Sequence, residues 1–230
     1  MDESSVSVRH PAKYTRVLLP YFSSILSDYG AIRVLDPMAG TGRIHDLSDL
    51  LPGLQTFGIE IEHEWAAMHP RTRQGDALDL PWPDGYFDAI VVSPTYGNRM
   101  ADHHDAMDGS RRNTYRHALG RSLSQNNSGA LQWGDQYRDF HRRAWAESAR
   151  VLRAGGVFVV NVKAHIRRGI VIDVPAWHAS ALRDLGLVQV AGYDVPCPGQ
   201  RFGQNGEARV DSAMIMVFEK PIQAGVRDGD

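Results

Sequence analysis

The stretch IRVLDPMAGTG, residues 32–42, decides the fold of this sequence. An apolar run ends at an acidic residue, and two glycines then lead into an amphipathic window. This order predicts a strand, a tight turn and a helix, with glycines that let the backbone approach a ligand closely. The stretch is not GxGxxG and no GK[ST] follows it, so neither a dinucleotide fingerprint nor a phosphate-binding P-loop is indicated.

Outward from this stretch, apolar strand-like runs alternate with amphipathic windows, which indicates an α/β fold with a mainly parallel sheet. We predict that Ala154-Gly155-Gly156 terminates a helix and that Val157–Val162 is a central strand buried on both faces. The expected helices are 12–28, 43–51, 138–152 and 175–185; the expected strands are 32–35, 56–59, 87–92, 157–162, 187–193 and 213–218, with a further strand ending at 74–77.

Composition narrows the class of protein. The chain has 230 residues, is 43% hydrophobic and has a formal net charge of −2, which suits one domain over 1–230 and gives no global electrostatic argument for nucleic acid or a membrane. We find no apolar run long enough to span a bilayer and no signal segment, and the single Cys197 excludes an internal disulfide. A cytoplasmic setting is expected.

Acidic residues end the first three predicted strands. Asp36 follows the first, Glu60 ends the second in GIE, and Asp76 lies in GDA after the third. Such positions suit a ligand with ribose and adenine, and no phosphate-binding lysine occurs in these loops. Taken singly, each acid could also be an ordinary surface carboxylate.

A second corner follows the strand 87–92, where FDAIVVSPTYGNR turns sharply at Ser93-Pro94-Thr95-Tyr96. The turn brings a hydroxyl, a proline carbonyl and an aromatic ring together, although a plain β-turn would also fit. Residues 97–137 then break the regular alternation with a long polar segment. A loop of that length is either functional or disordered, and a solvated surface insertion is the alternative.

The ordered set DPMAGTG, GIE, GDA and SPTY resembles the S-adenosylmethionine-dependent amino-methyltransferases of nucleic acids, the site-specific DNA N4-cytosine and N6-adenine enzymes, in a gamma-like motif order. Those enzymes carry a D-P-F-x-G-x-G loop and a [DNS]-P-P-[YFW] corner. The stretches HPAKY (10–14), RVLRAGG (150–156), NVK (161–163) and RFGQNGEARVD (201–211) extend the similarity over nearly the whole chain. Segment 97–137 is the least matched part.

The resemblance implies a Rossmann-like class I fold with a mainly parallel seven-stranded sheet and an insertion after strand 4. It implies S-adenosylmethionine as cofactor and methyl transfer to an exocyclic amino nitrogen of a DNA base flipped into the corner. The Ser93 side chain and the Pro94 carbonyl would accept the amino hydrogens, and Tyr96 would stack on the base. The cofactor would contact Asp36, Pro37, Met38, Gly40, Thr41, Gly42, Glu60, Ile61, Asp76, Ala77 and Ser93.

Segment 97–137 would then recognise the substrate. From 97 to 143 we count eight Arg against five Asp. The arginines favour contacts with phosphates, and the aromatic residues interleaved with them favour stacking on bases. The expected partner is a nucleic acid, with DNA favoured over RNA. The oligomeric state of the protein stays open. Expected substrate contacts are Thr95, Asn98, Arg99, Arg111, Arg112, Tyr115, Arg116, Arg121, Trp133 and Lys163.

Two departures and several alternatives stay open. Thr95 stands where the family has a second proline, which leaves weakened activity open, and Met38 replaces a Phe. Ser93 leans towards cytosine N4 over adenine N6. RNA and protein glutamine methyltransferases use similar corners, and a module that only binds cofactor or nucleic acid is the non-enzyme alternative. Asp102-His103-His104-Asp105 indicates a surface or substrate-facing cluster rather than a metal site, because adjacent histidines usually point apart.

Overall fold

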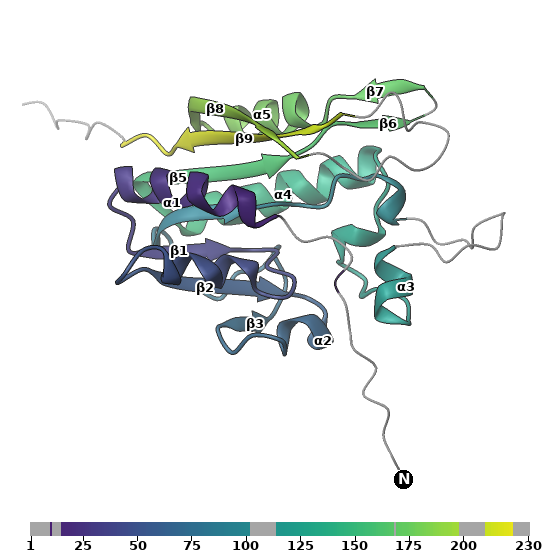
Figure 1. The fold of residues 1–230 in the computed structure, drawn as a ribbon, viewed down its shortest axis with the longest axis horizontal. Helices are drawn as coiled ribbons and strands as arrows, with labels where there is room; N and C mark the ends of the chain where they lie inside the picture. Colours follow the sequence, from purple (N-terminus) through teal and green to yellow (C-terminus); the bar gives the residue numbers. More distant parts are fainter. Residues whose placement is uncertain (1–9, 11–14, 102–113, 168, 198–209, 223–230) are drawn as a thin grey trace, which may run out of the picture.

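A single seven-stranded sheet forms the centre of the protein (Figure 1). The computed structural model describes residues 10, 15–101, 114–167, 169–197 and 210–222. The strand order is β3-β2-β1-β4-β5-β9-β8, in which β9 alone runs antiparallel to its neighbours β5 and β8. The strands are β1 (Arg33–Asp36), β2 (Gln55–Glu60), β3 (Thr72–Gln74), β4 (Phe87–Val92), β5 (Leu152–Val162), β8 (Val188–Pro196) and β9 (Ser212–Glu219). The expected mainly parallel sheet of seven strands is confirmed.

The chain order within the sheet reverses between β1 and β4. From β1 the chain builds outward through β2 and β3, and it then returns to add β4 on the other side of β1. In open α/β sheets the crevice at such a switch point, beyond the carboxyl ends of the strands, is where ligands bind. Both Asp36 and Ser93 lie there, one at the end of β1 and one directly after β4.

Helices cover the two faces of the sheet, each over its own apolar core (Figure 1). On one face, α1 and η2 bury side chains such as Phe22 and Ile44; on the other, α4 and α5 bury Trp145 and Leu182. Val157–Val162 is buried throughout and pairs on both sides, as predicted. The helical elements are η1 (Arg16–Leu18), α1 (Leu19–Asp28), η2 (Arg43–Asp49), α2 (His63–Ala66), η3 (Arg99–Ala101), α3 (Tyr115–Leu119), η4 (Ser128–Ala130), α4 (Asp135–Val151) and α5 (Val174–Asp184).

Two boundaries differ from the sequence-based expectation. The segment 43–51 forms a 3-10 helix over Arg43–Asp49 rather than an α-helix. The helix expected to stop at the glycine pair ends at Val151, and Gly155 and Gly156 lie inside β5. Gly155 has a φ of +70°, and a Cβ on Gly156 would lie 2.6 Å from Leu152 Cδ1, so the pair allows an irregularity in the strand instead of capping the helix.

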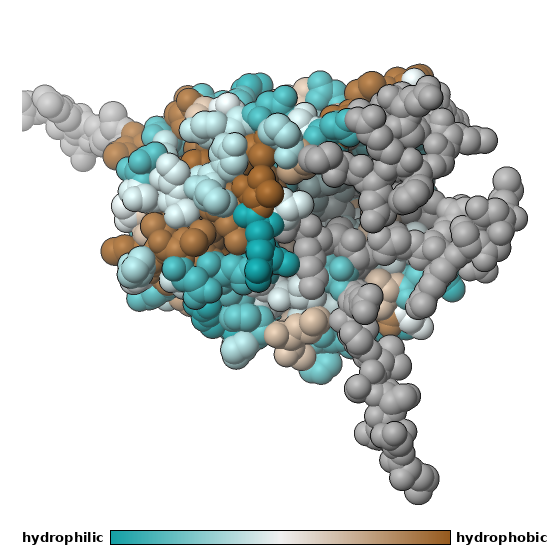
Figure 2. Space-filling view, viewed as in Figure 1, coloured by the Kyte–Doolittle hydropathy of each residue, from teal (hydrophilic) through white to brown (hydrophobic). Residues whose placement is uncertain are grey.

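A two-stranded hairpin was not predicted. It consists of β6 (His165–Arg167) and β7 (Ile170–Ile172) and follows β5 at the carboxyl end of the sheet. Ile170 and Val171 are exposed on it, and hydrophobic surface is visible at the upper edge of Figure 2, where β7 lies.

The described parts of segment 97–137 contain η3, α3 and η4 and, within those parts, no strand. Residues 102–113 lie outside the described residues, and with them Asp102-His103-His104-Asp105, Arg111 and Arg112. Within the described ranges, no helix combines the length and the apolar character needed to cross a membrane.

Candidate functional site

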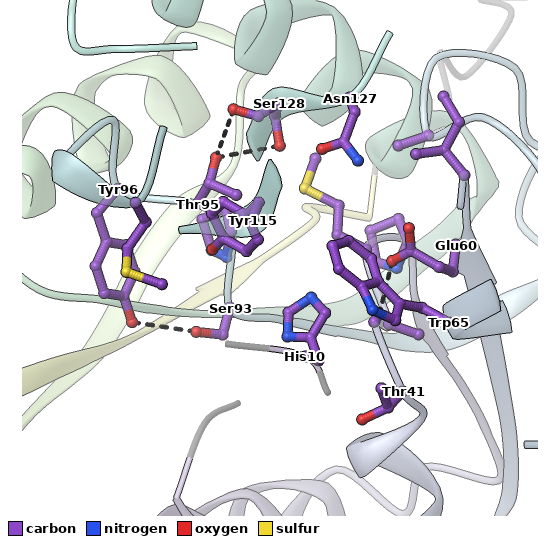
Figure 3. A pocket seen from close by; sticks show the side chains of 18 of the residues that line it. His10, Thr41, Glu60, Trp65, Ser93, Thr95, Tyr96, Tyr115, Asn127 and Ser128 are labelled. Carbon is purple, nitrogen blue, oxygen red and sulfur yellow. Dashed lines mark hydrogen bonds between the residues drawn. The ribbon is translucent and has the colours of Figure 1, made fainter. Parts of the chain in front are cut away.

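A cavity of about 240 Å³ opens at the switch point and joins the two predicted motifs (Figure 3). Its walls come from the loop after β1, the end of β2, the corner after β4 and the segment that carries η3, α3 and η4. Of the predicted site residues, thirteen line it: Pro37, Met38, Gly40, Thr41, Glu60, Ile61, Ala77, Ser93, Pro94, Thr95, Tyr96, Asn98 and Tyr115.

The loop after β1 needs its glycines. Gly40 and Gly42 have φ values of +53° and +82°, which favour glycine. A Cβ on Gly42 would lie 2.7 Å from the Cβ of His69, and the N–H of Gly40 donates to Glu60 Oε2 at 2.9 Å. The loop is thereby fixed to the end of β2, with Gly40 and Thr41 at the cavity wall.

Two carboxyl groups lie under this loop. Asp36 and Glu60 are 1% and 7% exposed. Burial raises the pKa of Asp36 to about 7, against the lowering effect of the Met38 N–H, which donates to Oδ1, and the charge of Glu60 raises it further. Burial likewise raises the pKa of Glu60 to about 7, although the N–H groups of Glu62 and Gly40 oppose this. The second oxygen of Asp36 has no hydrogen-bond partner among the described residues.

At the corner, a side chain of the NVK stretch (161–163), for which the sequence left the substrate cleft and simple strand-end solvation equally open, contacts Ser93. Asn161, at the end of β5 and 2% exposed, donates from Nδ2 to Ser93 Oγ at 3.0 Å. The Tyr96 hydroxyl lies 3.2 Å from the same Ser93 oxygen, as Figure 3 shows, and burial raises the pKa of Tyr96. If Ser93 donates its proton to Tyr96 and accepts from Asn161, one lone pair of its oxygen stays available to an incoming N–H group.

The segment after the corner docks on the turn after β2 through one buried carboxylate, Glu62. Its oxygens accept from Arg121 Nη2 at 2.8 Å, from the Ser124 N–H at 2.7 Å and from Asn127 Nδ2 at 2.7 Å. Although burial raises the pKa of Glu62, these donors outweigh it and hold the pKa below its usual range. Arg121, which was expected to contact substrate, also pairs with Glu64 at 2.6 Å and does not line the cavity.

The other predicted residues that the structure describes do not line the cavity. Asp76 Oδ2 accepts from Asn126 Nδ2 at 2.7 Å, Lys163 donates to the Cys197 carbonyl, and the Trp133 N–H donates to the Gly97 carbonyl at 2.8 Å. Arg116 is exposed on α3. Asp36 accepts from the N–H of Met38, a residue of the cavity wall, and Gly42 lies in the same loop. Arg99 is described in its backbone alone, and Arg111 and Arg112 lie outside the described residues.

Sequence reasoning left several cavity residues unassigned. The His10 ring packs edge-on against Trp65, with 4.4 Å between ring centroids, and both line the cavity. His10 belongs to the HPAKY stretch (10–14) that extends the resemblance to the amino-methyltransferases, so a signal for it existed. Asn127 and Ser128 carried no comparable signal, because only the docking on Glu62 brings them to the cavity.

Gly97→Ala should reduce stability more than Gly120→Ala does. Both glycines have positive φ, but a Cβ on Gly97 would lie 2.7 Å from the Trp133 backbone nitrogen, whereas nothing lies within 4 Å at Gly120. We expect a loss of about 1 kcal/mol in the free energy of unfolding for Gly120→Ala and about 3 kcal/mol for Gly97→Ala, measured by urea denaturation. Equal losses would contradict the close approach of the two backbones.

No family model and no curated protein matches this chain. Solved structures do match it. A SAM-dependent methyltransferase from Methanosarcina mazei aligns with a TM-score of 0.56 and 13% identity over 86% of this chain and 98% of that one. Geranyl diphosphate methyltransferase in complex with SAM gives 0.53 and 14% over 87% and 84%, and the [4+2]-cyclase SpnF gives 0.53 and 16% over 93% and 86%.

At these identities the likeness extends to the fold alone, and the cyclase shows that one fold serves more than one activity. The chain has the α/β Rossmann-like fold of the class I methyltransferases.

Proposed function

We propose that this protein is an S-adenosylmethionine-dependent methyltransferase that acts on an exocyclic amino nitrogen of a DNA base. One observation carries the proposal: a single cavity is lined both by the glycine loop with Glu60 and by the Ser93–Tyr96 corner. A methyl donor at the first and an amino group at the second would share one enclosed space, which is what direct transfer between them requires.

The residues at the loop end fit such a cofactor. Gly40 presents its backbone without a side chain, Glu60 offers carboxylate oxygens at the tip of β2 for ribose hydroxyls, and His10 and Trp65 give the wall an aromatic surface. The unpartnered oxygen of Asp36 is a further acceptor beneath the loop. S-adenosylmethionine, when bound, supplies an electrophilic methyl group on a positively charged sulfur.

The corner residues would prepare the amino group. An exocyclic amino nitrogen is a poor nucleophile because its lone pair is delocalised into the ring. Acceptors at Ser93 Oγ and the Pro94 carbonyl would take its two N–H groups and favour the pyramidal nitrogen that attacks. Asn161 supports this role of Ser93, because it fills one lone pair of Oγ and so orients the other.

DNA is the proposed substrate because the motifs match amino-methyltransferases of nucleic acids, and because the cavity residues Tyr96 and Tyr115 provide aromatic surface for a base taken out of its stack. Tyr115 is 6% exposed, so it would contact an inserted ring rather than a surface strand. Residues 97–137 would hold the flanking nucleotides. Of the two candidate target bases, we favour cytosine over adenine.

The test is a labelling experiment. Purified protein is incubated with S-adenosylmethionine carrying a radiolabelled methyl group and, separately, with DNA, tRNA, rRNA and protein; labelled products are digested to nucleosides or amino acids. We expect label in DNA as N4-methylcytosine or N6-methyladenine. Label in RNA or protein alone would retain the chemistry and overturn the substrate. No label in any pool, together with calorimetric binding of the cofactor, would favour a module that only binds it.

A further inference from the structure

The corner lacks the second proline of the motif that it resembles, yet Thr95 is held from two sides. Its hydroxyl lies 3.1 Å from both the carbonyl oxygen and the hydroxyl of Ser128 (Figure 3), and its own carbonyl accepts from the Tyr137 hydroxyl at 2.6 Å. Ser128 belongs to the segment docked on Glu62, whereas Tyr137 lies on α4. The two contacts therefore fix Thr95 to separate parts of the fold.

A buried chain of donors stands behind the second contact. Trp145 Nε1 donates to His178 Nδ1 at 3.0 Å, and His178 Nε2 lies 2.9 Å from the Tyr137 hydroxyl. The three side chains, from α4 and α5, are each 0% exposed. Because these side chains are shielded from water, each donor must find its acceptor within the protein.

The direction of each hydrogen bond from Trp145 through His178 and Tyr137 to Thr95 can be deduced. An indole N–H only donates, so His178 Nδ1 must carry a lone pair. Burial holds the pKa of His178 well below its usual range, so the ring is neutral and its one proton is on Nε2. Nε2 then donates to the Tyr137 oxygen, and the tyrosine proton has the Thr95 carbonyl as its acceptor.

We propose that Tyr137, oriented by His178 and Trp145, is a positioning residue that fixes the peptide after Thr95 and so does for this corner what a second proline would do. The Tyr137 hydroxyl acts on the Thr95 carbonyl, which belongs to the peptide that joins Thr95 to Tyr96 and lies two residues from Ser93. Unlike a proline ring, Tyr137 restrains the corner through a hydrogen bond, so the restraint can be removed by deleting a single hydroxyl group. Its role in methyl transfer rests on the proposed function; its role in ordering the corner does not.

The first test is hydrogen–deuterium exchange of peptides that cover residues 93–100. Tyr137→Phe deletes only the donor hydroxyl, and we expect exchange in these peptides to rise about tenfold, as the loss of one buried hydrogen bond implies. Tyr29→Phe is the control, since its hydroxyl donates at 2.6 Å to Glu219, the last residue of β9, and it should leave residues 93–100 unchanged. Unchanged exchange in Tyr137→Phe, or an equal rise in every peptide, would overturn the proposal.

Repeating Tyr137→Phe in a Thr95→Pro variant distinguishes a positioning role at the corner from a general loss of stability. In Thr95→Pro the ring restrains the corner directly, so the added effect of Tyr137→Phe on exchange should fall to about threefold or less. An undiminished effect would count against the proposal. Should Tyr137→Phe fail to fold, nitrogen-15 NMR of the unmodified protein decides: the proton of His178 must be on Nε2, and a proton on Nδ1 refutes the directed chain.

Once the substrate that accepts the methyl group has been identified, Tyr137→Phe should lower kcat about tenfold. The cofactor Kd should stay within about twofold, because the substitution does not touch the cofactor end of the cavity. An unchanged kcat, or a kcat loss matched by Tyr29→Phe, would argue against positioning. If no pool accepts label while exchange at residues 93–100 responds as expected, the proposed function fails and the positioning of the corner stands.

Discussion

Ser93→Ala should lower the rate of methyl transfer at least about a hundredfold while the cofactor Kd changes less than about threefold. The substitution removes the one acceptor at the corner whose geometry a second side chain, Asn161, controls at 3.0 Å. Removing a single preorganised hydrogen-bonding group from a site of this kind costs about 10² to 10³ in turnover. The rate is measured under single-turnover conditions with the nucleic acid that accepts label, and the Kd by calorimetry.

Ser148→Ala is the matched control for this substitution. Ser148 is a buried serine on α4 whose hydroxyl has no hydrogen-bond partner among the described residues, so its removal should leave turnover at the unmodified rate. A Ser93→Ala protein with full turnover would refute the acceptor role and with it the proposed chemistry of the corner. A loss of cofactor affinity equal to the loss of rate would instead make Ser93 a binding residue.

Asp36→Asn should stabilise the protein by about 2 kcal/mol more at pH 8 than at pH 5. Burial raises the pKa of Asp36 from 3.8 to about 7, so between these values the folded state binds more protons than the unfolded state. Stability of the unmodified protein therefore falls as pH rises from about 4 to about 7, and Glu60 contributes in the same direction. Asparagine imitates the protonated acid and retains an oxygen for the Met38 N–H.

The measurement is urea denaturation of the protein without added cofactor at pH 5 and pH 8. Asp88→Asn provides a control of opposite sign: burial would raise the pKa of Asp88, but the Arg33 N–H and the Arg153 guanidinium outweigh it and hold the pKa low. Its ionised form stabilises the fold, so this variant should lose stability at pH 8. A flat stability profile of the unmodified protein between pH 5 and pH 8 would show that Asp36 titrates normally.

The strand-end motifs could be predicted because they are local. A run of apolar residues that ends in Asp36, Glu60 or Ser93 is readable from the sequence, and parallel strands bring such ends to one edge of the sheet. The prediction that the glycine pair at 155–156 terminates α4 was wrong, because local sequence does not show which element a glycine belongs to. Glycine after a helix and glycine inside an irregular strand look alike until the partner strand is known.

The support around the corner could not be predicted in this way. Arg121 and Glu62 are 59 residues apart, and Asn161 and Ser93 are 68 apart, so no spacing rule relates them. Arg121 in a polar, arginine-rich segment suggests a free cation for phosphates, yet the fold places it against two carboxylates. The hairpin β6–β7 was missed because its strands have three residues each and leave Ile170 exposed.

The antiparallel strand β9 has a consequence for biosynthesis. Of the strands that the structure describes it comes last in chain order, yet it lies between β5 and β8 and pairs with both. As the chain leaves the ribosome, the edge of β5, with its run Val157–Val162, therefore has no partner until residues 212–219 have emerged. An apolar, β-branched edge of this kind is a template for pairing with another nascent chain. We therefore expect folding after synthesis to depend on how quickly residues 212–219 enter the sheet.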